Sequence, residues 1–255
     1  MSTKLHQLVS KWPSGAVRAV SSLKTEGYSA GLLRQYRQSG WLTSLGDNAV
    51  FRTGDTISPL GGLYALQHDL QLSVHLGGRS ALELQGLAHY LRNNRAELTL
   101  FGHDARLPKW FVSYDWKQPV HYRASNIVPV ELTEGLVLRE HQGFKVQIAS
   151  PALAMFEYLS LIPKDASFEE GLEIMSGLTT LRPDKVQRLL EACTSIKVKR
   201  LFLLLAEECN HPWVKRLDVD SVELGVGPRN LMVGGKLHKK YQVTVPESIL
   251  SRRIT

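Results

Sequence analysis

The chain has 255 residues, of which 43% are hydrophobic and 22% charged, and its formal net charge is +7. This composition is typical of a folded globular protein and excludes disordered and collagen-like classes. The two cysteines, Cys193 and Cys209, are too few for a disulfide framework, and the first residues lack the apolar core of a signal peptide, so we expect a cytoplasmic protein. The longest apolar run, 201–206, is far shorter than the ~20 residues that cross a bilayer, which argues against a membrane partner.

The positive charge is divided between the two ends of the chain. Residues 1–95 carry a net charge of +5 and residues 181–255 a net charge of +6, whereas residues 96–180 carry a net charge of −4. This segregation predicts two basic patches rather than a uniformly basic surface. A basic patch attracts anionic partners such as nucleic acid, although a solvated surface that favours solubility explains any single cluster equally well.

Apolar spacing and cap residues in the first 53 residues predict a winged helix-turn-helix. A helix over 4–12 is followed by a short strand over 16–20 and a helix over 21–26. Ser29 is placed to cap a third helix over 30–38, which Gly40 ends. Strands over 41–45 and 49–53 then flank a tight turn, Gly46-Asp47-Asn48. This is the order of a fold whose second helix-turn-helix helix enters the major groove of DNA.

The predicted helix over 30–38 carries side chains suited to reading DNA. Leu32, Leu33 and Tyr36 share its apolar side. Since arginine pairs with guanine and glutamine with adenine, we assign base contacts to Arg34, Gln35, Arg37 and Gln38. We assign phosphate contacts, and backbone or minor-groove contacts from the wing, to Lys24, Ser29, Asn48 and Arg52. The alternative is that these residues are the solvated face of a helix in a protein-interaction module.

The remainder of the chain predicts a second domain of mixed α/β structure, so the fold class is α+β. After a linker over 53–59, a helical segment over 60–70, an extended one over 71–75 and a helix over 79–91 are expected. A small sheet is predicted at about 96–148, with strands over 97–101, 110–114, 120–124, 136–139 and 144–148. Helices follow at about 150–209, and strands over 222–224 and 241–245 end the domain. The predicted domains are therefore 1–56 and 57–255.

No pattern in the sequence requires an enzyme, a metal or a cofactor. The histidines and cysteines lack metal-ligand spacing, and the nucleophile-elbow and dinucleotide patterns are absent from the sequence. Gly77-Gly78-Arg79-Ser80 opens a predicted helix, where free N–H groups can hold an anion. Because the segment lacks the spacing of a P-loop, we interpret it as a tight strand-to-helix turn.

Several segments resemble the AbiEi family of antitoxins. They are Leu23-x-x-x-Gly27-Tyr28-Ser29, Tyr36-Arg37-x-Ser39-Gly40-Trp41-Leu42, the run from Val74 to Gly86, His211-Pro212-Trp213 and Lys240-Tyr241-x-Val-Thr-Val-Pro246. The resemblance implies the antitoxin of a type IV toxin–antitoxin pair used in abortive infection of phage-infected cells. Such a protein would bind inverted repeats of double-stranded DNA in its own promoter as an autorepressor. It would also neutralise a nucleotidyltransferase-like toxin, in most type IV systems without a stable complex.

One departure from the family concerns the wing. The turn reads Gly46-Asp47-Asn48-Ala49-Val50-Phe51, where the family typically has Gly-Arg-Gly-Val-Tyr, so the expected contact between wing and phosphate is weaker.

Two other functions stay open for the second domain. Its basic residues suggest a surface that contacts a protein or RNA, beside a winged helix that does not bind DNA. The third possibility is an enzyme that modifies the toxin, for which the sequence shows no phosphate-binding motif. The candidate residues of this domain are Arg79, Lys197, Lys199, Arg200, Lys239 and Lys240.

Overall fold

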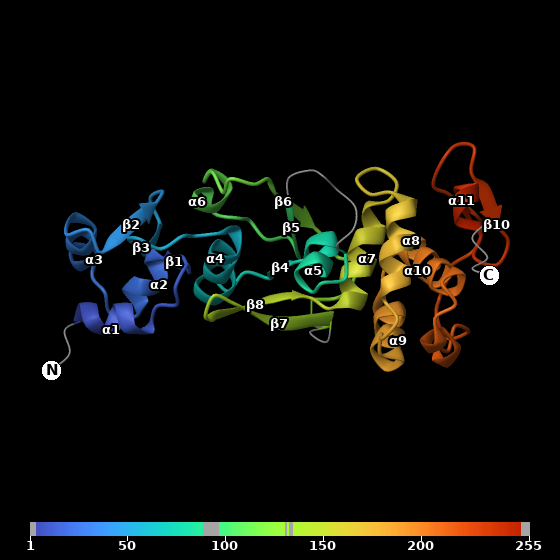
Figure 1. Ribbon diagram of the computed structural model, residues 1–255, viewed down its shortest axis with the longest axis horizontal. Helices are drawn as coiled ribbons and strands as arrows, with labels where there is room; N and C mark the ends of the chain where they lie inside the picture. The colour runs from blue at the N-terminus through green and yellow to red at the C-terminus, as the bar shows by residue number, and fades with distance from the viewer. Residues whose placement is uncertain (1–3, 89–96, 131, 133–134, 251–255) are drawn as a thin grey trace. The chain divides into compact units, whose positions relative to one another are not determined.

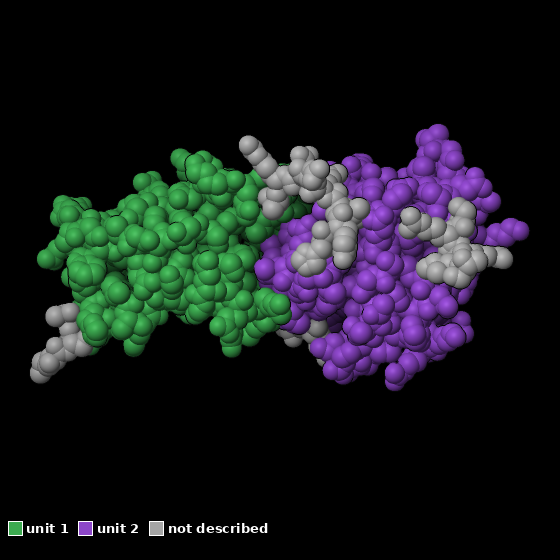
Figure 2. All heavy atoms as spheres, viewed as in Figure 1, with its two compact units in different colours: residues 1–75, 96–124, 138–147 green, residues 76–95, 125–137, 148–255 purple. Residues whose placement is uncertain are grey.

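The computed structural model describes residues 4–88, 97–130, 132 and 135–250. The fold is α+β, with helices and three small sheets (Figure 1). The chain forms two compact units (Figure 2). Unit 1 comprises residues 1–75, 96–124 and 138–147, and unit 2 comprises residues 76–95, 125–137 and 148–255. The predicted domain boundary at residue 56 falls inside unit 1 and stays a prediction.

Residues 4–52 form the predicted winged helix-turn-helix. Its elements are α1 (Lys4–Lys11), β1 (Arg18–Ala19), α2 (Val20–Thr25), α3 (Ala30–Gln38), β2 (Leu42–Leu45) and β3 (Ala49–Arg52). The three strands form an antiparallel sheet in the order β1-β3-β2, and Leu45 faces Ala49 across the wing turn. The Ser29 hydroxyl caps α3 by accepting the N–H of Leu32 at 3.3 Å. The local cap and turn signals therefore predict this part of the fold correctly.

A five-stranded sheet and three short helical segments follow the winged helix. The helical segments are α4 (Pro59–Tyr64), a π-helical turn η1 (Ala65–Asp69) and α6 (Lys109–Val112). The strands are β4 (Val74–Leu76), β5 (Leu98–Gly102), β6 (Val120–Ala124), β7 (Leu136–His141) and β8 (Phe144–Ala149), in the order β6-β5-β4-β8-β7. The strand predicted over 110–114 is wrong, because this segment contains α6. Trp110 and Phe111 are adjacent and both buried, which the two-residue alternation of a half-buried strand does not allow.

Unit 2 is mainly helical. Its elements are α5 (Gly78–Leu84), α7 (Pro151–Leu161), α8 (Phe168–Gly177), α9 (Pro183–Ala192), α10 (Ile196–Glu208), a 3-10 helix η3 (Pro212–Arg216), β9 (Arg229–Asn230), β10 (Lys236–His238), β11 (Val243–Val245) and α11 (Glu247–Leu250). The helix predicted over 79–91 ends earlier, at Leu84, and residues 89–91 of that prediction lie outside the described part of the chain. The strand predicted over 222–224 does not form.

The core of unit 2 lies between α7 and α10. Phe156 and Phe202 are fully buried, and their ring centroids are 4.6 Å apart. Residues 198–206 of α10 are all buried, so this helix has almost no solvent-facing side in its central turns. Among the described residues, no helix is long and apolar enough to cross a membrane, and no three His, Cys, Asp or Glu side chains are grouped as metal ligands.

Candidate nucleic-acid interface

Helix α3 brings the four predicted base-reading residues together on one element. Its apolar side is anchored by Leu33 and Tyr36, which are 1% and 7% exposed. The opposite side presents three exposed side chains and one half-buried side chain; the exposed ones are Arg34, Gln35 and Gln38, and the half-buried one is Arg37. The helix is thus fixed by packing while its long polar side chains face the solvent, as a helix that enters a DNA groove requires.

Two predicted phosphate ligands flank the start of α3. Lys24 is exposed in the last turn of α2, and Ser29 is exposed at the N-cap of α3. The Ser29 oxygen accepts the capping bond from Leu32, and a serine hydroxyl that accepts one hydrogen bond can also donate one. Both positions are therefore compatible with phosphate contact.

The wing residues are less free than the sequence suggests. The Arg52 guanidinium pairs with the Asp55 carboxylate, with Nε and Nη2 at 3.1 and 3.2 Å from its two oxygens. Asp55 also accepts the N–H of Gly15 at 2.8 Å, so this carboxylate is held in place. Asn48 has an exposed side chain, while its backbone carbonyl accepts the N–H of Val20 at 2.9 Å. Arg52 must therefore leave Asp55 before it can bind a phosphate.

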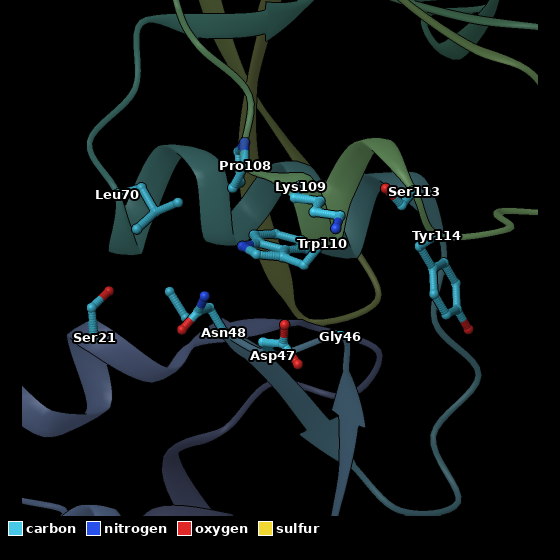
Figure 3. A pocket seen from close by; sticks show the side chains of 11 residues that line it. Ser21, Gly46, Asp47, Asn48, Leu70, Pro108, Lys109, Trp110, Ser113 and Tyr114 are labelled. Atoms are coloured by element: carbon cyan, nitrogen blue, oxygen red, sulfur yellow. The ribbon is translucent and has the colours of Figure 1, made fainter.

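The wing turn and α6 together line a cavity of about 350 Å³ (Figure 3). The turn contributes its three residues, and the segment around α6 contributes an aromatic and basic wall. The lining residues are Ala19, Ser21, Gly46, Asp47, Asn48, Leu70, Pro108, Lys109, Trp110, Ser113 and Tyr114. No short-range pattern relates α6 to the wing, because the two segments are about sixty residues apart in the chain.

The start of α5 is occupied by the protein itself. The N–H of Gly78 donates to the Glu157 carboxylate at 2.8 Å, and Glu157 is 1% exposed. A buried carboxylate thus takes the place that an external anion would need, which supports the interpretation of Gly77-Gly78 as a tight turn. Arg79 follows and pairs with Glu83 at 2.6 Å and Glu170 at 2.7 Å, so it too is bound within unit 2.

The other basic candidates of unit 2 do not form one exposed face. Lys199 and Arg200 are only 4% and 3% exposed, because they lie on the buried central turns of α10, and their prediction as surface residues is wrong. Lys197 is half-buried and donates to the carbonyls of Ser160 and Ile162 at 2.7 Å. The two remaining candidates are exposed: Lys239, and Lys240, which pairs with Glu207.

The Arg200 guanidinium binds four backbone carbonyls. Nε donates to Leu224 at 2.7 Å, and Nη2 donates to Gly225 at 2.9 Å. Nη1 donates to Gly227 at 2.7 Å and to Gln242 at 3.1 Å. The carbonyls of Leu224, Gly225 and Gly227 belong to one loop, so the buried Arg200 cation anchors this loop to α10.

Comparison with known proteins places these features in a family. The model described as "Transcriptional regulator, AbiEi antitoxin N-terminal domain" matches residues 1–93, and the model described as "Transcriptional regulator, AbiEi antitoxin, Type IV TA system" matches residues 95–246. The crystal structure of the RV2827C protein from Mycobacterium tuberculosis is similar with a TM-score of 0.62 and 17% identity, over 96% of this chain and 92% of that one. At this identity the likeness shows the fold alone, and no curated protein matches the chain. The chain therefore belongs to the AbiEi antitoxin family of transcriptional regulators in type IV toxin–antitoxin systems.

Proposed function

We propose that this protein binds inverted repeats in the promoter of its own operon and represses transcription there. The observation that carries the proposal is α3, a capped and packed helix with Arg34, Gln35 and Gln38 exposed along it. Membership of a family of transcriptional regulators supports the same function. Arginine and glutamine reach base edges in the major groove by bidentate hydrogen bonds, so this helix is the element that would distinguish one operator from another.

Promoter binding tests the proposal directly. The Arg34→Ala, Arg37→Ala double variant should lose at least about tenfold in affinity for the upstream promoter, since each bidentate base contact is worth about 1–3 kcal/mol. The measurement is a titration of labelled promoter DNA followed by anisotropy or gel shift. Lys117→Ala is the control, since Lys117 is an exposed residue that pairs with Asp115. If the double variant binds promoter DNA as the wild type does, the assignment of α3 as the recognition helix is wrong.

We further propose that the protein neutralises a nucleotidyltransferase-like toxin without catalysing a reaction and without a stable complex. The family description as an antitoxin of a type IV system supports this function. Co-expression tests it: the full chain should restore growth of cells that produce the toxin from the neighbouring gene. Size-exclusion chromatography of the two proteins together should then show no stable complex. Incubation of both proteins with labelled ATP would reveal label on the toxin if the antitoxin were instead a modifying enzyme.

A second candidate function is that of a protein- or RNA-interaction module. The observation in its favour is that apolar side chains of the segment 225–240 are exposed to solvent near basic ones. Val226 and Val233 are 89% and 100% exposed, and Lys236 and Lys239 are exposed as well. Exposed aliphatic side chains favour a protein partner, because a nucleic-acid backbone offers them little apolar surface. Co-purification of a partner, lost in Val226→Ser, Val233→Ser, without retention on promoter DNA would select this function.

A further inference from the structure

The wing of this protein lacks a cation of its own at the turn. The turn consists of Gly46, Asp47 and Asn48, and its charged member is the exposed acid Asp47. Arg52, at the end of β3, is bound by Asp55. A wing of this kind would bring a negative charge toward the phosphates that it is expected to approach.

Helix α6 lies directly against this turn. Gly46 has a φ of +63°, and a Cβ at this position would lie 3.2 Å from the Cβ of Trp110. Asp47 and Asn48 line the same cavity as Lys109 and Trp110, and Figure 3 shows the turn facing this wall of the cavity. The segment that follows β5 is thus next to the end of the wing.

Lys109 is the positively charged residue at the contact between α6 and the wing turn. Among the described residues that line the cavity it is the one basic side chain, and Asp47 is the one acidic side chain. Lys109 is exposed, and no ion pair joins it to another described residue. We propose that Lys109 binds a phosphate of the DNA backbone beside the wing, in place of the basic residue that the turn lacks. The inference rests on the proposed DNA-binding function.

The backbone that carries Lys109 is fixed by aromatic packing. Trp110 and Phe111 are 6% and 2% exposed, and the indole N–H of Trp116 donates to the Phe111 carbonyl at 2.9 Å. Gly62 of α4 leaves the space that these rings need, since a Cβ there would lie 2.7 Å from Trp116 and 2.8 Å from Phe111. Because the backbone at Lys109 is already ordered, phosphate binding would cost only the conformational entropy of the lysine side chain.

The salt dependence of DNA binding distinguishes a phosphate contact from a structural role. Each phosphate that a protein cation neutralises contributes about 0.9 to the slope of log K against log salt. Full-length Lys109→Gln should therefore bind promoter DNA with a slope smaller by about 0.9, measured between ~50 and ~200 mM NaCl. Its affinity for unrelated duplex DNA should fall by the same factor, because phosphate contacts carry no sequence information. Lys109→Arg should keep the wild-type slope.

Two further variants complete the experiment. Lys117→Gln, which removes an exposed lysine of the same segment, should leave the slope unchanged. Asp47→Lys, placed in the Lys109→Gln background, should restore the slope by returning a cation to the turn itself. An unchanged slope in Lys109→Gln, with wild-type binding intact and the Arg34, Arg37 double variant impaired, would overturn the role of Lys109 alone. Absence of promoter binding by the wild-type protein would overturn the proposed function, and the role of Lys109 with it.

Discussion

The Arg18 guanidinium is bound by the Asp69 carboxylate, with Nε at 2.9 and 3.0 Å from the two oxygens. The side chain of Asp69 is fully buried, and its carboxylate also accepts the N–H of Ala19 at 2.6 Å. Arg18 in turn pairs with Glu26 and lies 5.8 Å from the centre of the Trp12 ring. Burial alone would lower the pKa of Arg18, but its hydrogen bond to Asp69 and the charges of Asp69 and Glu26 raise this pKa overall. The pair joins β1 of the winged helix to the π-helical turn that follows α4.

Asp69→Asn should lower the free energy of unfolding of the full chain by about 1–3 kcal/mol, because the buried Arg18 guanidinium would keep only the exposed Glu26 as its ion-pair partner. Urea denaturation followed by tryptophan fluorescence measures the change. Asp115→Asn, which breaks the exposed pair with Lys117, should leave the unfolding midpoint in place. Equal midpoints for Asp69→Asn and the wild type would show that the pair does not hold the winged helix.

Glu157 offers a second test, at the start of α5. Glu157→Ala should lower the free energy of unfolding by about 1–3 kcal/mol, since the buried N–H of Gly78 would lose its acceptor. Glu157→Gln should cost less, because the amide oxygen can still accept that bond. Thermal unfolding of the wild type, Glu157→Ala and Glu157→Gln ranks the three proteins by stability. A glutamine variant as unstable as the alanine variant would mean that the negative charge, rather than the acceptor, is what the site requires.

Arg200→Met should loosen the exposed loop that follows Leu224. The substitution keeps much of the buried volume but removes four hydrogen bonds to backbone carbonyls, so a loss of about 2–3 kcal/mol is expected. Hydrogen exchange should accelerate in residues 224–242, while the winged helix keeps its protection. Arg216→Met, at an exposed arginine of η3, is the matched control. Unchanged exchange in the loop would contradict an anchoring role for Arg200.

His141 should make the stability of the protein depend on pH in weakly acidic solution. Burial lowers the pKa of this histidine below its usual value of 6.5, and its Nε2 has no hydrogen-bond partner among the described residues. The unfolded chain therefore binds a proton more readily than the folded one, so stability is complete above about pH 6.5 and declines as the pH falls below it. His141→Phe, which keeps a ring against Phe144, should lose less stability between pH 7 and pH 5, as urea titrations at each pH would show.

If His141→Phe loses as much stability as the wild type over the same range, another group is responsible for the acid sensitivity.

The winged helix was predictable because its signals are local. Ser29 caps α3, and the positive φ angles of Gly27 and Gly40 end helices α2 and α3 where the sequence suggests. The strand predicted over 110–114 failed for a tertiary reason: Phe111, one of the aromatic residues that favour a strand here, packs with Trp116 into the space left by Gly62.

The candidate site was predictable only where exposure follows from helical periodicity. Arg34, Gln35 and Gln38 are exposed on α3 as expected. Lys199 and Arg200 are not, because α10 is surrounded by protein and its charged residues are used inside the fold. The pairing of Arg18 with Asp69, and the contact between the wing and α6, depend on chain segments that no short-range pattern relates.

Under the proposed DNA-binding function, the attachment of the winged helix also bears on how this protein could acquire a new DNA specificity. Besides the ion pair, a Cβ at Gly61 would lie 2.0 Å from the carbonyl oxygen of Gly15, so the two segments fit only as a matched set. A winged helix from another protein, fused to the rest of this chain, would have to supply an arginine that pairs with Asp69. Its backbone would also have to approach Gly61 as closely as Gly15 does. The exposed side chains of α3 take part in neither of these two contacts. Under the proposed function, point substitution on α3, rather than exchange of the whole winged helix, is therefore the accessible route to a new operator.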